Sequence, residues 1–346
     1  MSAMAALGQL TIGDVARATG GRAGAGTDPA ATLAGVSIDS RTLEPGQLFV
    51  AIAGPRFDGH EFVGEAAARG AAAALVHRAP SRPVSIPLIT AADTTAALGA
   101  LAADVRARAG VPVVAVTGSA GKTTTKEMTA WLLAARGEVL KTEGNLNNQY
   151  GLPLSLLRLR GEHTAAVLEL GMSAAGELRA LSALARPDVA IITLVAPVHL
   201  EFFASVDAIA DAKAEILEGL REGGVAILNG DDARVRQRGR RHPGRVIWFG
   251  KDRAFDVWAE NWRGTVNGMR FDMRLGGRTL DVALPLAGPH FMMNFLAAAA
   301  AAHHLGVDPD TIVERALTLK PAARRGEVLR LGRGVTLLDD SYNSNP

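Results

Sequence analysis

A glycine-rich segment in the first half of the chain has the residue types and spacing of a phosphate-binding loop. It reads Thr117, Gly118, Ser119, Ala120, Gly121, Lys122, Thr123 and Thr124, directly after an apolar run. Backbone N–H groups at such a strand-to-helix turn can surround phosphates, and the helix dipole favours their charge. Lys122 would reach the β- and γ-phosphates, and the Thr123 hydroxyl would bind Mg²⁺. Val116 replaces the first glycine of the usual pattern, so the alternative is a turn without nucleotide.

Two further polar residues follow apolar runs. Glu169 lies inside the run Val167 to Leu170, where an unpaired carboxylate is costly, so pairing, protonation or metal binding is expected. The carboxyl end of a parallel strand would face the same crevice as the phosphate loop, which favours a metal ligand over a structural ion pair. His199 follows the run 189–194 and should project nearby, although a lone histidine is more often structural.

Lys213 lies on the apolar face of a helix that we expect to begin near Ser205. It is four residues after Ile209 and three before Ile216. By helix geometry alone, a lysine that snorkels from the edge of this face is the simpler interpretation. The functional alternative is that an uncharged, buried amine reacts with CO₂ to give a carbamate anion suited to a second Mg²⁺.

The elements that would position these residues indicate an α/β protein. Apolar runs at 111–116, 165–170, 189–194 and 225–228 alternate with segments long enough for helices, which predicts a mostly parallel sheet covered on both sides. Gly-linked strands within 245–287 predict a small antiparallel subsheet. Helices are expected at 94–109, 291–305 and 309–319. We place domain boundaries at 1–109, 110–326 and 327–346, the last being the start of a further domain.

Composition narrows the class of protein. The 346 residues are 48% hydrophobic and 21% charged, which is typical of globular proteins with more than one domain. Cysteine is absent, no signal peptide is recognised and no apolar run approaches the ~18 residues of a membrane span, so a cytoplasmic protein is expected. The net charge of +2 and the lack of aromatics among the arginines of 234–245 argue against nucleic-acid binding.

Taken together, these motifs resemble the Mur ligase family. The phosphate loop, Glu169 before Leu170-Gly171, the segment 196–201 and Ala212 to Glu215 occur in the family's order and spacing. Further likeness covers the rest of the chain. It lies in Ser37 to Arg41 and Asp58 to His60 near the start, in Gly288 to His290 with Asn294, in Arg325, and in the terminal segment 339–346. Asn145 to Asn148, running into 151–154, and that terminal segment are similar to members that add D-alanyl-D-alanine.

The resemblance implies a UDP-binding N-terminal domain, a central ATP-binding domain and a Rossmann-like third domain. It implies ATP and two Mg²⁺ ions, with Thr123 and Glu169 at one metal and His199 and carbamylated Lys213 at the other. Lys122 would stabilise the transferred phosphoryl group. It further assigns nucleotide contacts to Asn294, Arg325, Asp340 and Asn343, and contacts to UDP-N-acetylmuramoyl-tripeptide to Ser40, Arg41, Asn147 and Asn148. D-alanyl-D-alanine would be the second substrate, and a monomer is expected.

The chain stops where the family's third domain would begin. Because that domain contacts D-alanyl-D-alanine and closes the site, we expect this chain alone to be inactive or nearly so. Three alternatives remain: another ligase of the Mur or folylpolyglutamate type, a P-loop regulatory NTPase, and a nucleotide-binding fragment without turnover. CO₂-dependent metal binding and substrate profiling would separate them.

Overall fold

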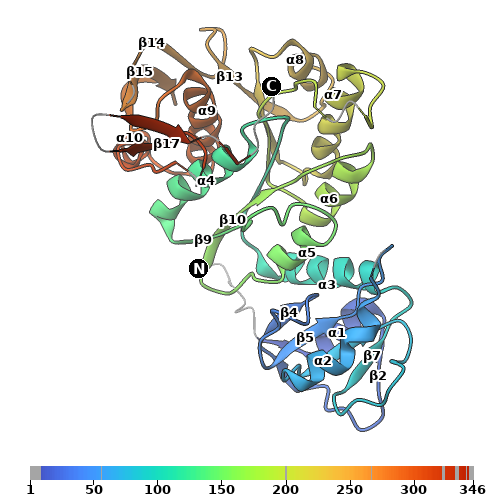
Figure 1. Cartoon of the computed structure of the whole chain (residues 1–346). Coiled ribbons are helices and arrows are strands. Elements are labelled where there is room, and N and C mark those ends of the chain that lie inside the picture. The colour runs from blue at the N-terminus through green and yellow to red at the C-terminus, as the bar shows by residue number, and fades with distance from the viewer. Residues whose placement is uncertain are drawn as a thin grey trace, which may run out of the picture. The chain divides into compact units, whose positions relative to one another are not determined.

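The chain folds into two compact units. The computed structural model describes residues 9–55, 57–198, 201–265, 267–321, 324–331, 335–339 and 341–342. One unit combines Met1–Gly110 with Glu143–Gly161, and the other combines Val111–Thr142 with Glu162–Pro346 (Figure 1). Residues 143–161, which fall within the predicted central domain, therefore group with the N-terminal unit. The functional roles assigned to the predicted domains remain predictions.

The N-terminal unit contains a five-stranded sheet of order β2-β7-β6-β5-β4 and a separate antiparallel pair, β1 and β3. Strands β4 to β7 are parallel and β2 is antiparallel to β7. The elements of this unit are β1 (Leu10–Thr11), α1 (Ile12–Thr19), β2 (Arg22–Ala23), β3 (Thr32–Leu33), β4 (Gly35–Ser37), β5 (Gln47–Val50), η1 (Gly59–Phe62), α2 (Val63–Ala68), β6 (Ala73–Val76), β7 (Leu88–Thr90), α3 (Thr94–Ala109) and α5 (Gly151–Leu156).

The second unit contains a nine-stranded sheet of order β16-β15-β14-β13-β12-β11-β8-β10-β9. Its strands are β8 (Val113–Thr117), β9 (Glu138–Lys141), β10 (His163–Glu169), β11 (Val189–Ile192), β12 (Val225–Asn229), β13 (Arg245–Gly250), β14 (Val257–Thr265), β15 (Gly268–Leu275) and β16 (Arg278–Leu284). Strands β8 to β14 are parallel to their neighbours, and β14, β15 and β16 pair antiparallel. A separate hairpin joins β17 (Glu327–Arg330) to β18 (Thr336–Asp339).

Helices cover both faces of this sheet. On one side α4 packs against α9 and β10, and on the other α6 packs against β8 while α8 packs against β12 (Figure 1). The helices are α4 (Lys122–Leu133), η2 (Ala134–Arg136), α6 (Glu177–Ala185), α7 (Val206–Ala214), η3 (Glu215–Gly219), α8 (Ala233–Gly239), α9 (Pro289–His304) and α10 (Pro309–Ala316). The alanine-rich α9 is buried along most of its length, so its backbone approaches the sheet closely. No helix in the described part of the chain is long and apolar enough to cross a membrane.

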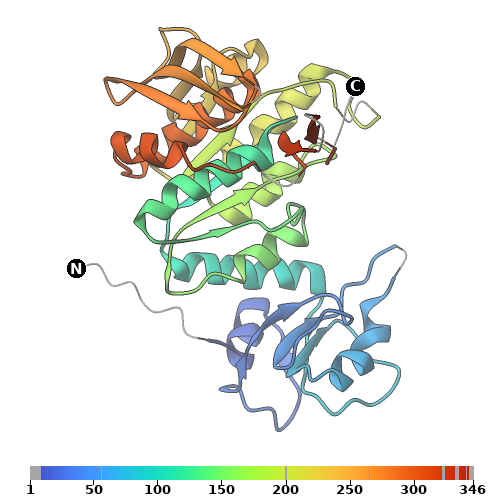
Figure 2. The same cartoon turned by 60° about the vertical axis from the view of Figure 1, so that its left-hand side comes forward.

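The predicted fold class is confirmed. The continuous apolar runs form parallel strands buried on both faces, as β8 and β12 show with every residue buried. The predicted antiparallel subsheet is present in β14, β15 and β16, but its predicted first strand is wrong, because β13 pairs in parallel with both β12 and β14 and so belongs to the parallel part of the sheet (Figure 2). Strand β9 was not predicted, because its sequence Glu-Val-Leu-Lys is short and has polar ends.

Helix α3 offers a test of how local sequence fixes an element. Asp93 caps its first turn by accepting hydrogen bonds from the backbone N–H groups of Thr95 and Ala96 at 2.7 and 2.9 Å, and Gly110 ends it at φ 66°. We predict that Asp93→Ala lowers the free energy of unfolding by about 1 kcal/mol, because these N–H groups lose their acceptor. Asp93→Asn keeps an acceptor and should retain most of the stability. Urea denaturation would measure both variants, and equal losses would contradict the capping role.

Candidate active site

Two glycines determine the path of the phosphate loop between β8 and α4. Gly118 has φ 151° and Gly121 has φ 82°, conformations that other residues rarely adopt. A Cβ atom on Gly118 would collide with the Thr193 hydroxyl, and one on Gly121 would lie 2.5 Å from Asn294 Oδ1. Both positions therefore require glycine for conformation and for space, which suits a loop whose backbone must approach a ligand.

The loop is tied to the segment that follows β11. Ser119 Oγ donates to the Ala196 carbonyl at 3.1 Å and accepts from the Ala196 N–H at 2.8 Å. The Thr193 hydroxyl donates to the Ala120 carbonyl at 2.5 Å. Thr117 ends β8, and its hydroxyl donates to the Leu170 carbonyl at 2.9 Å, while Thr124 is buried in the first turn of α4. The loop is thus held in shape by its protein neighbours.

Thr123 and Glu169 meet at the carboxyl end of the sheet. The Thr123 hydroxyl donates to Glu169 Oε2 at 2.7 Å, and the Glu169 side chain is only 3% exposed. A hydroxyl and a carboxylate beside a phosphate loop supply the hard oxygen donors that Mg²⁺ prefers, so the donor set fits this metal. Among the described residues, no group of three or more His, Asp or Glu side chains forms a metal site by itself.

Lys122 interacts electrostatically with this carboxylate and with two further cations, Arg325 and Lys213. Lys122 Nζ donates to the Gly118 carbonyl at 2.9 Å, folding back over the loop. Burial lowers the pKa of Lys122; the Glu169 carboxylate opposes this shift and the Arg325 guanidinium reinforces it. Burial likewise lowers the pKa of Lys213 to about 7, with the charge of Lys122 acting in the same direction. Lys122 therefore interacts with each of the other three groups, Glu169, Arg325 and Lys213.

Lys213 is buried and does not snorkel to solvent. Ser205 caps α7 by accepting from the Ala208 N–H, and Ile209, Ala210 and Ala212 bury the same helix against its surroundings. The Lys213 side chain is 3% exposed because α7 packs against both α6 and α8. The simpler interpretation from helix geometry is therefore wrong, since tertiary packing covers the edge of the helix face along which the lysine would have extended.

Two predicted nucleotide contacts also lie near the loop. Asn294, on α9, is buried with its amide oxygen against Gly121. The Arg325 guanidinium lies 4.4 Å from the ring centroid of Tyr342 and close enough to Lys122 to affect its pKa. Asn294 thus lies at the start of α4, beside the positive end of the helix dipole, and Arg325 acts on the side chain of the first residue of the same helix.

The remaining predicted site residues form two groups, those that the structure does not describe and those that belong to the N-terminal unit. His199, Asp340 and Asn343 lie outside the described residues. Ser40, Arg41, Asn147 and Asn148 all belong to the N-terminal unit. There, Ser40 is buried and Arg41 pairs with Asp39 at 2.7 Å, while Asn148 Oδ1 accepts from the Gly151 N–H at 2.9 Å and so supports the start of α5.

Sequence reasoning missed Thr193, Thr142 and Asp232. Thr142 follows β9 and its hydroxyl accepts from the Glu169 N–H at 3.0 Å. Asp232 Oδ2 accepts from the Val195 N–H at 2.7 Å and so holds the segment after β11. Each acts across 27 to 76 residues of sequence. A polar residue at the end of an apolar strand was the available signal, since Thr193 and Glu169 share that position.

Comparison with known proteins shows which family of proteins this chain resembles. Residues 116–302 match the model described as "Mur ligase middle domain", and residues 32–127 match "Mur ligase family, catalytic domain". The UDP-N-acetylmuramoyl-tripeptide–D-alanyl-D-alanine ligase of Escherichia coli is 43% identical over 91% of this chain and 70% of its own length. A crystal structure of MurF from Acinetobacter baumannii superimposes with a TM-score of 0.90 at 35% identity, covering 98% of this chain and 74% of that one. MurF ligase from Thermotoga maritima, in complex with ADP, gives 0.79 at 32% identity over 89% and 71%.

The contact between Gly118 and Thr193 leads to a prediction for nucleotide binding. Gly118→Ala should weaken the binding of ATP by about tenfold or more, because strain of about 1–3 kcal/mol at positive φ adds to the collision with Thr193. Gly223→Ala is the matched control, since Gly223 has φ 75° but open space around it. Displacement of a fluorescent nucleotide would measure both. Wild-type affinity in Gly118→Ala would show that the loop tolerates a side chain.

Proposed function

Because the chain belongs to the Mur ligase family, we propose that it is an ATP-dependent ligase that joins D-alanyl-D-alanine to UDP-N-acetylmuramoyl-tripeptide. The similarity to the Escherichia coli ligase carries this proposal, and the phosphate loop with Glu169 supports its ATP-dependent half. The product is the UDP-muramoyl-pentapeptide used in peptidoglycan synthesis. No observation favours the regulatory NTPase or another amide ligase of the family.

The reaction forms one amide bond for each ATP consumed. The terminal carboxylate of the tripeptide attacks the γ-phosphorus of ATP, giving an acyl phosphate and ADP. The neutral amine of D-alanyl-D-alanine then attacks the acyl carbon, and the tetrahedral intermediate expels inorganic phosphate as a proton leaves the nitrogen. Lys122 would neutralise charge on the transferred phosphoryl group from the start of α4, so that catalysis rests on positioning and electrostatics.

Four residues that the sequence predicted as metal ligands would bind two Mg²⁺ ions. Thr123 and Glu169 would hold one ion, while Lys213, as a carbamate, and His199 would hold the second. When bound, Mg²⁺ neutralises phosphate charge and orients the transferred group. The 2.7 Å contact between Thr123 and Glu169 supports the first assignment.

Burial supports carbamylation of Lys213. The ammonium group first loses one proton, and the neutral amine then attacks CO₂ and loses a second, so a cation becomes an anion at the same position. The side chain is 3% exposed and its pKa is lowered to about 7, which makes the neutral amine available near neutral pH. A carbamate would also replace repulsion between Lys213 and Lys122 with attraction.

The remaining assignments follow from the family. Residues 1–109 would bind the UDP-linked substrate, and residues 110–326 would bind ATP. The residues in contact with the UDP-linked substrate would include Ser40, Arg41, Asn147 and Asn148. Arg325, Asn294, Asp340 and Asn343 would contact the nucleotide. A monomer in the cytoplasm stays our prediction.

Phosphate release tests the ligase function. The chain would be fused to the part of the Escherichia coli ligase that the match leaves uncovered, because the chain spans 70% of that relative. We expect phosphate release from ATP when both UDP-N-acetylmuramoyl-tripeptide and D-alanyl-D-alanine are present, and little without either. The Lys122→Ala fusion, lacking the phosphate-binding amine, is the inactive control. Hydrolysis that is indifferent to both substrates would favour the NTPase alternative.

Carbamylation can be observed directly. With ¹³C-labelled bicarbonate, we expect a carbamate NMR signal that disappears in Lys213→Met. Lys126→Met is the matched control, because Lys126 is equally buried but donates to the Thr142 carbonyl and pairs with Glu127. Since only the neutral amine reacts, the signal should fall as the pH drops below about 7. A signal that survives in Lys213→Met would place the carbamate elsewhere.

A further inference from the structure

Lys126 is a buried lysine that the proposed reaction does not use. It lies on α4 one turn beyond Thr123, and its side chain is among the largest that are fully buried, at 1% exposure. Its Nζ donates to the Thr142 carbonyl at 2.7 Å and pairs with Glu127 Oε1 at 2.9 Å. Burying an ammonium group is costly unless it is paired and hydrogen-bonded, so both contacts are needed.

Thr142 connects this lysine to Glu169. Thr142 is fully buried directly after the edge strand β9, and its N–H donates to the Val167 carbonyl at 3.1 Å. Its hydroxyl accepts from the Glu169 N–H at 3.0 Å. Thr142 therefore binds the C-terminal end of β10 twice, through its backbone N–H at Val167 and through its hydroxyl at Glu169, the residue that carries the carboxylate.

Helix α4 consequently contacts Glu169 by two routes. Thr123 donates directly to the carboxylate, and Lys126 acts through Thr142 on the backbone that carries it. We propose that Lys126 is a positioning residue that holds Thr142, and through it the Glu169 carboxylate, in the geometry that receives a Mg²⁺–nucleotide at the phosphate loop. This role rests on the proposed function, since it assigns Glu169 to the metal.

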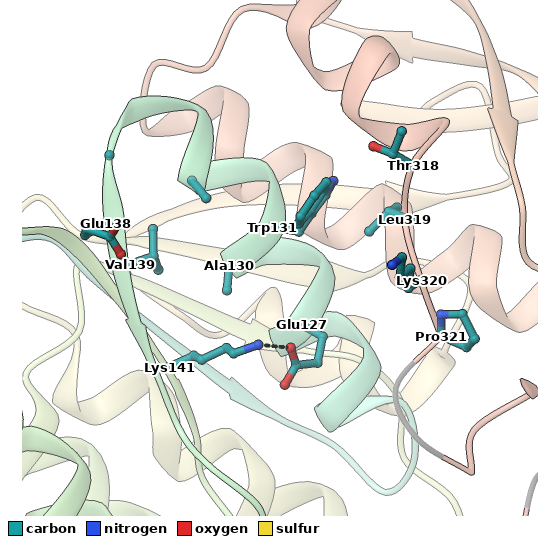
Figure 3. A pocket seen from close by; sticks show the side chains of 12 residues that line it. Glu127, Ala130, Trp131, Glu138, Val139, Lys141, Thr318, Leu319, Lys320 and Pro321 are labelled. Carbon is teal, nitrogen blue, oxygen red and sulfur yellow. Dashed lines mark hydrogen bonds and ion pairs between the residues drawn. The ribbon is translucent and has the colours of Figure 1, made fainter.

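The ion pairs of Glu127 allow the positioning role of Lys126 to be distinguished from a role in neutralising the Glu127 carboxylate. Its carboxylate binds Lys126 on the buried side and Lys141 on the exposed side, where Lys141 and Glu127 face each other in a surface pocket (Figure 3). Burial raises the pKa of Glu127, but hydrogen bonds from Lys141 and Lys126 outweigh it and keep the carboxyl ionised. Lys141 thus shares the acid, but within the described part of the chain it is the Lys126 ammonium, and not that of Lys141, that donates to the Thr142 carbonyl, which makes Lys141→Met a matched control.

The test measures how Mg²⁺ affects binding of AMP-PNP, a non-hydrolysable ATP analogue, to the 346-residue chain. Calorimetry at graded Mg²⁺ concentrations and in EDTA separates metal-dependent from metal-free affinity. Lys126→Met and Thr142→Val should each raise the Mg²⁺ concentration for half-maximal binding about tenfold or more, as expected when a partner of a metal ligand is lost. Metal-free affinity should hardly change. Lys141→Met and Thr142→Ser should match the wild type. The double variant with Lys126→Met and Thr142→Val should shift the Mg²⁺ dependence little more than either single change does, because both changes break the same route.

Different failures have different meanings. Equal losses with and without Mg²⁺, or a Lys141→Met variant that behaves like Lys126→Met, would overturn the positioning role and leave Lys126 as a structural ion. If Lys126→Met does not fold, Thr142→Val decides, because it removes only the hydroxyl: unshifted Mg²⁺ dependence there overturns the proposal. A wild-type chain that binds no nucleotide at any Mg²⁺ concentration would instead overturn the proposed function.

Discussion

The close approach of Gly118 to Thr193 constrains the whole carboxyl edge of the central sheet. Thr193 follows β11, which pairs in parallel with β8, and its carbonyl accepts from Asn229 Nδ2 at the end of β12. The phosphate loop therefore takes its shape from the ends of three adjacent strands. A different strand order would remove the hydroxyl against which Gly118 is packed, and with it the constraint on the backbone path of the loop.

Electrostatics and packing oppose each other around Glu169. The fold places Lys122 where it interacts with the buried Glu169 carboxylate and with two cations, Lys213 and Arg325, and burial is the main cause that lowers the pKa of both lysines. Such a site is poorly balanced without anions and well suited to phosphates. The same burial that weakens the charge of Lys213 makes its amine a nucleophile, so one packing arrangement serves both electrostatic relief and the proposed carbamate.

The sequence predicted the strands and the phosphate loop, whose signals lie within a few neighbouring residues. Apolar runs located β8, β10, β11 and β12, and the glycines with Lys122 and Thr123 located the loop, because these signals lie within a few residues. The burial of Lys213 could not be decided, since it depends on α6 and α8 packing around α7. The position of Thr193 at the end of an apolar strand was a local signal, but the partners of Thr142 and Thr193 could not be predicted, because they lie 27 and up to 76 residues away and become neighbours only through strand order. The grouping of 143–161 with the N-terminal unit depends on α5 packing against α3, again a contact distant in sequence.

That grouping has a consequence for how the protein is made. The polypeptide passes between its two units at residues 110–111, 142–143 and 161–162, so neither unit is one continuous stretch of chain. The surface of α3 that packs against α5 stays uncovered until α5 has been synthesised. The phosphate loop, α4 and β9 precede α5 in the chain and are therefore synthesised first. The N-terminal unit can therefore be completed only after residues 111–142, which belong to the second unit, have been synthesised. The second unit is still incomplete at that stage and must avoid aggregation until the rest of its chain follows.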